Sequence, residues 1–280
     1  MKELEAKEHS KSDKVPWQLE QFRYSLKKQK KLQALKPMLR AASGQTCLLI
    51  TCGDNNGALN WHLRQSGGEW RWAEVEPERI VQISDLMGEP VVQIDKLAPA
   101  LPFQPDTFDL IVVIDVHEHL PEPGLLNKEL ERVIKPGGKV IVTTPGADES
   151  KLANRIKNML GMRPNDYGHL VPGYSIESLR QQLQAVGMES YAQASYSRFF
   201  TEFMELLLNF GYVRVLSAIK GENLESGQVA PKNEDDLKSM GKTYRIYSFL
   251  FPIIRAVSAL DVLDRSKTGY AVIVAAEKAN

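Results

Sequence analysis

The segment Cys47–Glu76 constrains the fold more than any other part of this 280-residue chain. It opens with Cys47–Ile50, an apolar run short enough for a buried strand, and continues into the polar loop Gly53–Gly57. Apolar spacing then predicts a helix, and Trp70–Val75 has the pattern of a second strand. Strand, glycine-bearing loop, helix and strand make half of a nucleotide-binding βαβ unit, which indicates an α/β protein.

The loop and the end of the second strand form the first candidate site. Glycines let the backbone approach a ligand closely, and a helix N-terminus presents unbonded N–H groups to an anionic group. The second strand closes on two acids, Glu74 and Glu76. Glu74 lies about twenty residues beyond the loop, where an acid can accept hydrogen bonds from both hydroxyls of a ribose.

Strands and helices continue to alternate along the chain. The patterns predict helices at Glu78–Met87 and Leu125–Ile134 and strands at Pro90–Ile94, Phe108–Asp115 and Lys139–Thr143. Such alternation is typical of a doubly wound parallel sheet with right-handed crossovers, whose ligands bind at the carboxyl ends of the strands. We therefore expect Gly53–Gly57, Glu74, Asp95 and Asp115–His119 to lie along one rim.

A series of short motifs follows Asp95 in a specific order. They are Leu101-Pro102-Phe103, Phe108-Asp109, Glu118-His119-Leu120 and Arg132-Val133-Ile134-Lys135-Pro136-Gly137-Gly138. In this order and spacing the chain resembles the class I S-adenosylmethionine-dependent methyltransferases of the small-molecule type, over about residues 45–197 and again at 269–276. The resemblance implies a Rossmann-like, doubly wound, mostly parallel seven-stranded sheet with a helical insertion before the last strand. It also implies S-adenosyl-L-methionine as the cofactor.

The resemblance assigns roles to the residues of the rim. Gly53–Gly57 would hold the methionine end of the cofactor, Glu74 the ribose, and Asp95 the adenine edge, while Asp115–His119 would lie under the methionine moiety and face the acceptor. The cofactor-binding candidates are Thr51, Gly53, Asp54, Asn55, Gly57, Glu74, Val75, Asp95, Lys96, Asp115 and His119.

Two positions depart from the family pattern. Thr51 stands where the family usually has an acid, and Asn55 replaces its middle glycine. Asn tolerates a positive φ better than most residues, so the turn can persist, and Asp54 is a candidate for the missing carboxylate. These departures leave a non-catalytic relative that binds the cofactor or a partner as the alternative function. A dinucleotide oxidoreductase shares the opening βαβ unit but not the later motifs.

Methyl transfer needs alignment of the acceptor, exclusion of water and, for a protonated acceptor, a general base. His117 and His169 are the candidate catalytic residues, whereas His119 matches the scaffold of the family. No His, Cys and carboxylate residues have the close sequence spacing of metal ligands, so no metal site is expected. Cys47 and Cys52 are expected to be reduced packing residues.

The two remaining regions lie outside the sheet. Residues 1–15 are expected to be disordered and 16–40 to be helical and basic, either as a solvated face or as a surface for an anionic membrane or a phosphorylated substrate. Residues 198–267 interrupt the domain formed by 41–197 and 268–280. Their apolar segments, Phe199–Ile219 and Arg245–Leu263, predict a helical acceptor cap, a homodimer surface or a peripheral membrane contact, and Lys220–Gly241 between them is polar.

Composition narrows the class of protein. The formal net charge is zero, which argues against a protein that coats nucleic acid. The charged start of the sequence lacks a secretory pattern, so a cytoplasmic location is expected, with association at a membrane surface as an extension of it. The predicted function is S-adenosylmethionine-dependent methyl transfer to oxygen, nitrogen or carbon of a small or lipid-like acceptor.

Overall fold

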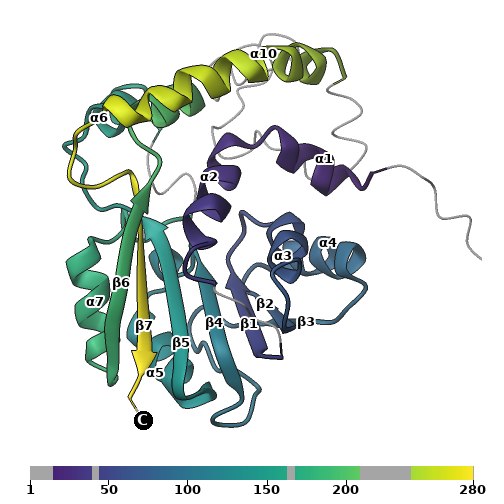
Figure 1. The fold of residues 1–280 in the computed structure, drawn as a ribbon, viewed down its shortest axis with the longest axis vertical. Helices are drawn as coiled ribbons and strands as arrows, with labels where there is room; N and C mark the ends of the chain where they lie inside the picture. The colour runs from purple at the N-terminus through teal and green to yellow at the C-terminus, as the bar shows by residue number, and fades with distance from the viewer. Residues whose placement is uncertain (1–14, 40–43, 163–167, 209–240, 280) are drawn as a thin grey trace, which may run out of the picture.

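The computed structural model describes residues 15–39, 44–162, 168–208 and 241–279. Its strands are β1 (Thr46–Thr51), β2 (Glu69–Glu74), β3 (Val91–Gln93), β4 (Phe108–Ile114), β5 (Ile134–Pro145), β6 (Met188–Tyr196) and β7 (Ala271–Lys278). They form one seven-stranded sheet in the order β3-β2-β1-β4-β5-β7-β6 (Figure 1). Strands β3 to β5 of this order pair in parallel, and β7 is antiparallel to both β5 and β6. The sheet confirms the predicted doubly wound α/β fold.

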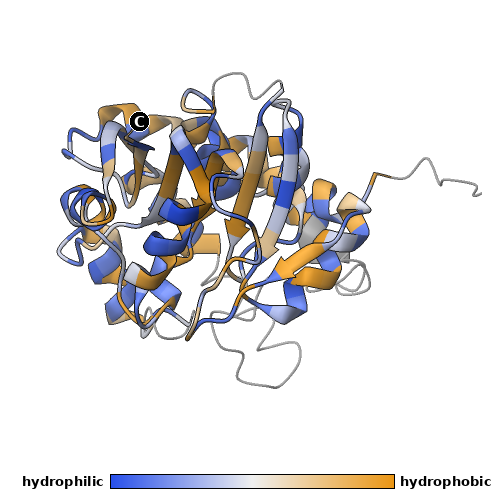
Figure 2. Cartoon of the chain, turned by 90° about the horizontal axis from the view of Figure 1, so that it is seen from below, coloured by the Kyte–Doolittle hydropathy of each residue, from blue (hydrophilic) through white to orange (hydrophobic). Residues whose placement is uncertain are grey.

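Helices cover both faces of the sheet. They are α1 (Trp17–Arg23), α2 (Leu26–Leu35), α3 (Ala58–Arg64), α4 (Pro77–Met87), α5 (Pro123–Val133), α6 (Leu152–Met159), α7 (Ile176–Gln184) and α10 (Gly241–Ala259), with the 3₁₀ turns η1 (His117–His119) and η4 (Leu260–Leu263). Residues of α5 and α7 pack on one face, and residues of α2, α3 and α4 pack on the other. Alternate β1 side chains therefore enter two cores, Leu48 and Ile50 one of them and Cys47 and Leu49 the other. Figure 2 shows the apolar central strands between these layers.

Two boundaries differ from the sequence expectation. The apolar positions of the basic N-terminal segment fall into two stripes that are out of phase, which predicts a break near Lys28–Lys31. The break lies instead at Tyr24–Ser25, between α1 and α2, and four lysines of the continuous helix α2 have ion-pair partners. The predicted strand Lys139–Thr143 is the inner part of β5, which begins at Ile134 because extended pairing starts directly after α5. Cys47 and Cys52 are buried and unpaired, as expected.

The insertion contributes a helical layer above the carboxyl ends of the strands. Figure 1 shows α10 crossing over α1 and α2, and residues 199–208 are also helical. Phe251 and Ile254 of α10 are buried against Leu26 of α2. By length and composition alone, Arg245–Leu263 could cross a membrane, and 22% of that window is buried in the fold. The expected disordered tail and most of Lys220–Gly241 lie outside the described residues.

Candidate functional site

The loop after β1 is built by its own side chains. Gly53 and Gly57 have φ values of +73° and +99°, and Gly57 precedes the first residue of α3. The Asn55 amide donates to Asn60 Oδ1 at 2.6 Å, and its carbonyl oxygen accepts from Gly57 N–H at 3.1 Å. The backbone at Asn55 does not have a positive φ, so the conformational reason expected for this residue is wrong. Asn55 maintains the turn through side-chain hydrogen bonds.

Glu74 stabilises this loop from below and is fully buried. One carboxylate oxygen accepts the Thr51 hydroxyl at 2.6 Å, and the other accepts the N–H groups of Gly53 at 2.9 Å and Glu76 at 2.8 Å. Burial raises the pKa of Glu74, and these donors oppose the rise. The expectation that Glu74 contacts the ribose is therefore corrected, because its oxygens are enclosed and already bonded. Thr51 therefore acts as a hydrogen-bond donor to the Glu74 carboxylate.

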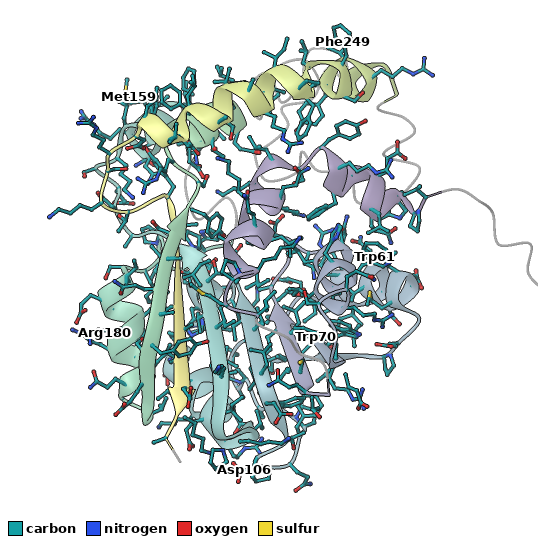
Figure 3. The ribbon with its side chains drawn as sticks, viewed as in Figure 1. Trp61, Trp70, Asp106, Met159, Arg180 and Phe249 are labelled. Atoms are coloured by element: carbon teal, nitrogen blue, oxygen red, sulfur yellow. The ribbon has the colours of Figure 1, made fainter. Side chains whose placement is uncertain are left out.

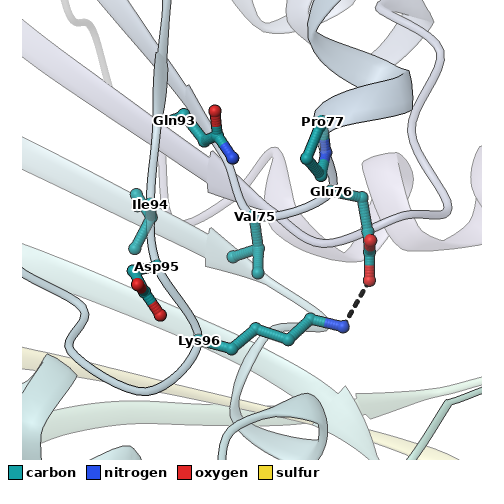
Figure 4. A pocket seen from close by; sticks show the side chains of 7 residues that line it. All are labelled: Val75, Glu76, Pro77, Gln93, Ile94, Asp95 and Lys96. Carbon is teal, nitrogen blue, oxygen red and sulfur yellow. Dashed lines mark hydrogen bonds and ion pairs between the residues drawn. The ribbon is translucent and has the colours of Figure 1, made fainter.

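A cavity of about 580 Å³ lies at the carboxyl ends of β2 and β3 (Figure 4). It is lined by Val75, Glu76, Pro77, Gln93, Ile94, Asp95 and Lys96. The Glu76 carboxylate is 37% exposed and forms an ion pair with Lys96. Asp95, Lys96 and Val75 thus lie together as predicted. Glu76 was given no site role from the sequence; it lies two residues beyond the end of β2 and is the N-cap residue of α4.

The end of β4 brings in a residue from the N-terminal helix. Asp115 has a φ of +50°, and its carboxylate pairs with Lys31 of α2, which is 3% exposed. Lys28 of the same helix pairs with Asp54 of the glycine loop at 3.3 Å. Asp54 is consequently turned to α2, and the expectation that it replaces the missing acid at Thr51 is not met. The burial of Lys31 contradicts the expectation of a solvated basic face, whereas the expectation of a surface for an anionic ligand stays a prediction.

The histidines predicted for catalysis occupy two different environments. His117 is fully buried, and its Nε2 donates to Asn127 of α5 at 2.8 Å. Burial lowers its pKa to about 4. Because no part of it is exposed, His117 is corrected to a packing residue. His169 is half-buried on the rim with its ring 4.8 Å from that of His119, and burial followed by the effect of His119 lowers its pKa to about 4.

The structure also assembles a cluster that the linear spacing did not predict. Ligand-capable atoms of Glu118, His119 and His169 all lie within 4.8 Å of one another. The expectation of no metal site depends on spacing in the sequence, and this cluster in space removes that reason for it. His169 is about fifty residues from the other two in sequence, so only the return of the chain after α6 brings it to the rim.

Half of the chain matches a known protein family. Residues 53–193 match the sequence model of a family described as a methyltransferase domain. A ubiquinone biosynthesis O-methyltransferase of Xylella fastidiosa is 30% identical over 128 residues, which are 41% of this chain and 51% of the relative. An uncharacterized methyltransferase of Mycobacterium tuberculosis is 39% identical over 96 residues, 34% of this chain and 38% of the relative. This chain thus spans about half the length of the first of these curated relatives and less of the second.

A solved structure has the same architecture. The S-adenosylmethionine-dependent methyltransferase from Mesorhizobium loti aligns with a TM-score of 0.51 at 12% identity, covering 87% of this chain and 95% of that chain. This likeness concerns the fold. The cavity fits S-adenosylmethionine chemically, because Glu76 offers an exposed carboxylate for hydroxyl groups and Val75 an apolar wall. The backbone at Gly53 also lies close to the Glu76 side chain, since a Cβ atom at Gly53 would come within 3.3 Å of it.

Proposed function

The chain belongs to the class I S-adenosylmethionine-dependent methyltransferases, and we propose on that premise that it methylates a hydroxyl oxygen of a small or lipid-like molecule. The Xylella fastidiosa relative, whose name gives an O-methyltransferase of ubiquinone biosynthesis, supports oxygen over the nitrogen and carbon alternatives. The cavity at the ends of β2 and β3, with the Glu76 carboxylate in its wall, is the observation that carries the cofactor-binding part of the proposal.

Different residues of the chain have different roles in the proposed methyl transfer. When bound, S-adenosylmethionine supplies a methyl group that is already activated. Glu76 and Asp95 bind its polar groups in the cavity, and Lys96 orients the Glu76 carboxylate. Burial lowers the pKa of both His119 and His169, which favours uncharged rings at neutral pH.

Calorimetry with S-adenosylhomocysteine tests the assignment of Glu76. Glu76→Gln keeps the size of the side chain and removes its charge, and hydrogen bonds to a charged group contribute about 1.5–3 kcal/mol. We therefore expect binding at least about tenfold weaker than in the wild type. Glu78→Gln is the matched control, because Glu78 is an exposed acid two residues further on and does not line the cavity.

Equal affinities in Glu76→Gln and the wild type would contradict the role of Glu76. NAD serves as the control ligand. We expect it not to bind, since a dinucleotide oxidoreductase does not share the motifs that follow Asp95. Transfer of a labelled methyl group to hydroxylated aromatic acceptors then tests the proposed reaction. The cytoplasmic location, and the peripheral membrane contact or homodimer through residues 198–267, stay predictions.

A further inference from the structure

Glu118 is a buried carboxylate without a hydrogen-bond partner. Its exposed fraction is 0%, and neither carboxylate oxygen has a partner among the residues that the structure describes. Removing an unpaired carboxylate from water is costly unless a cation or a hydrogen bond compensates it. Burial, followed by the charge of Asp115, raises the pKa of Glu118, and the charges of Lys31 and Lys27 oppose that rise.

Two imidazoles stand beside this carboxylate. His119 is 8% exposed, and its Nδ1 lies 3.0 Å from the Gly168 carbonyl oxygen. A carbonyl oxygen can only accept, so Nδ1 carries the proton and the lone pair of the uncharged ring is on Nε2. Donation of one ring N–H to a backbone carbonyl is the arrangement that orients metal-binding histidines. His169 completes the group, with its ring at 86° to that of His119.

We propose that Glu118, His119 and His169 bind a divalent transition-metal cation of the zinc class. Two imidazoles and one carboxylate are a ligand set of such cations, whereas calcium and magnesium prefer oxygen ligands alone. Bonds of about 2.0–2.1 Å in a tetrahedral site require ligand atoms about 3.4 Å apart. The ligand atoms lie within 4.8 Å of one another, so binding would have to bring them closer by up to about 1.4 Å.

The position of the cluster on the rim indicates what a bound cation does in the reaction. Glu118 and His119 follow β4 on the rim, and the charges of Lys96, Asp115 and Glu76 all act on His119. Three protein ligands leave a coordination position for an oxygen atom of another molecule. Resting on the proposed function, we assign that position to the acceptor hydroxyl, whose pKa the cation would lower. Binding of the cation itself does not depend on that function.

Titration of chelator-treated protein with Zn²⁺ tests the site without any methyl acceptor. We expect one equivalent of Zn²⁺ to bind per chain by calorimetry, and Co²⁺ to give a visible absorption band from imidazole ligation. Glu118→Gln, His119→Gln and His169→Gln should each bind Zn²⁺ at least about 100-fold more weakly, because each removes one of three protein ligands. His62→Gln is the control, since His62 of α3 packs against Phe22 and Trp61, away from the cluster.

Each outcome decides between the two claims. A far-ultraviolet circular dichroism spectrum and a Tm like those of the wild type report that a variant is folded, so loss of Zn²⁺ binding by a folded variant supports the site. No saturable binding of Zn²⁺ or Co²⁺ to the folded wild type, or equal binding by His169→Gln, would overturn the proposal and leave Glu118 as a neutral carboxylic acid. One bound Zn²⁺ without any methyl transfer would keep the site and reject the proposed function.

Discussion

Individual residues at this rim are held in place by partners that are far away in sequence. Lys31 and Asp115 are 84 residues apart, yet they form a buried ion pair that joins α2 to the end of β4. The Lys31 side chain is 4% exposed and that of Asp115 is 18% exposed. Burial opposes the charge of Lys31, but Asp115 outweighs it and raises the pKa of Lys31 above its usual value. Lys31 therefore stays charged, and its ion pair holds the Asp115 side chain against α2 at the end of β4.

The Lys31–Asp115 pair is expected to behave as a unit. Lys31→Met leaves Asp115 partly buried without a partner, which should lower the free energy of unfolding by about 2–4 kcal/mol in urea titrations. Lys31→Met combined with Asp115→Asn should recover part of that loss, because the uncompensated charge is gone. Strictly additive losses in this double-mutant cycle would show that the two side chains are not coupled in solution.

At the scale of elements, α10 is attached by one face and exposed on the other. Phe251 and Ile254 are 7% and 3% exposed, and Phe251 packs edge-to-face on Tyr24 with ring centroids 5.4 Å apart. Phe249, two residues away, is 80% exposed at the far side of the helix (Figure 3). The expected cap is thus a layer that packs on the N-terminal helices. Contact of its outer face with a membrane or with a second chain stays a prediction.

The two phenylalanines of α10 provide a matched test of that attachment. Phe251→Ala should destabilise the protein by about 2–4 kcal/mol, because a buried aromatic ring is removed and a cavity is left. Phe249→Ala should change stability by less than about 0.5 kcal/mol, since its ring is in solvent. Urea unfolding curves of both variants measure the difference. A similar loss in both would mean that the outer face of α10 is covered in solution.

Across the whole molecule, ion pairs between buried acids and partly exposed lysines join the insertion to the N-terminal helices and to the sheet domain. Glu202, in the helical stretch 199–208, pairs with Lys27 of α2 at 3.2 Å and also with Lys157 of α6. Asp261 of η4 accepts from Lys30 of α2 at 2.7 Å. Burial opposes ionisation of Glu202, but Lys27 and Lys157 outweigh it and hold its pKa far below the usual range.

Stability should therefore fall in acid through Glu202. A carboxyl group whose pKa is lower in the folded protein stabilises it fully above its unfolded pKa of about 4.3, and this stabilisation is lost as the pH falls below about 5. Glu202→Gln should lower the Tm at pH 7, by the equivalent of about 2–3 kcal/mol, and should flatten the decline of Tm between about pH 5 and pH 3. Parallel Tm profiles for the variant and the wild type would contradict this linkage.

What the sequence alone determined is what depends on neighbours along the chain. Apolar runs predicted β1, β2 and β4, and the order of short motifs identified the family, because strand pattern and loop chemistry are local properties. Only the tertiary structure decided which acid faces the cavity, since Glu74 and Glu76 differ in burial and not in type. It also decided the partner of Lys31 and the meeting of His169 with Glu118. These contacts form between segments that the sheet order brings together, and that order is set by packing of the whole core rather than by any local pattern.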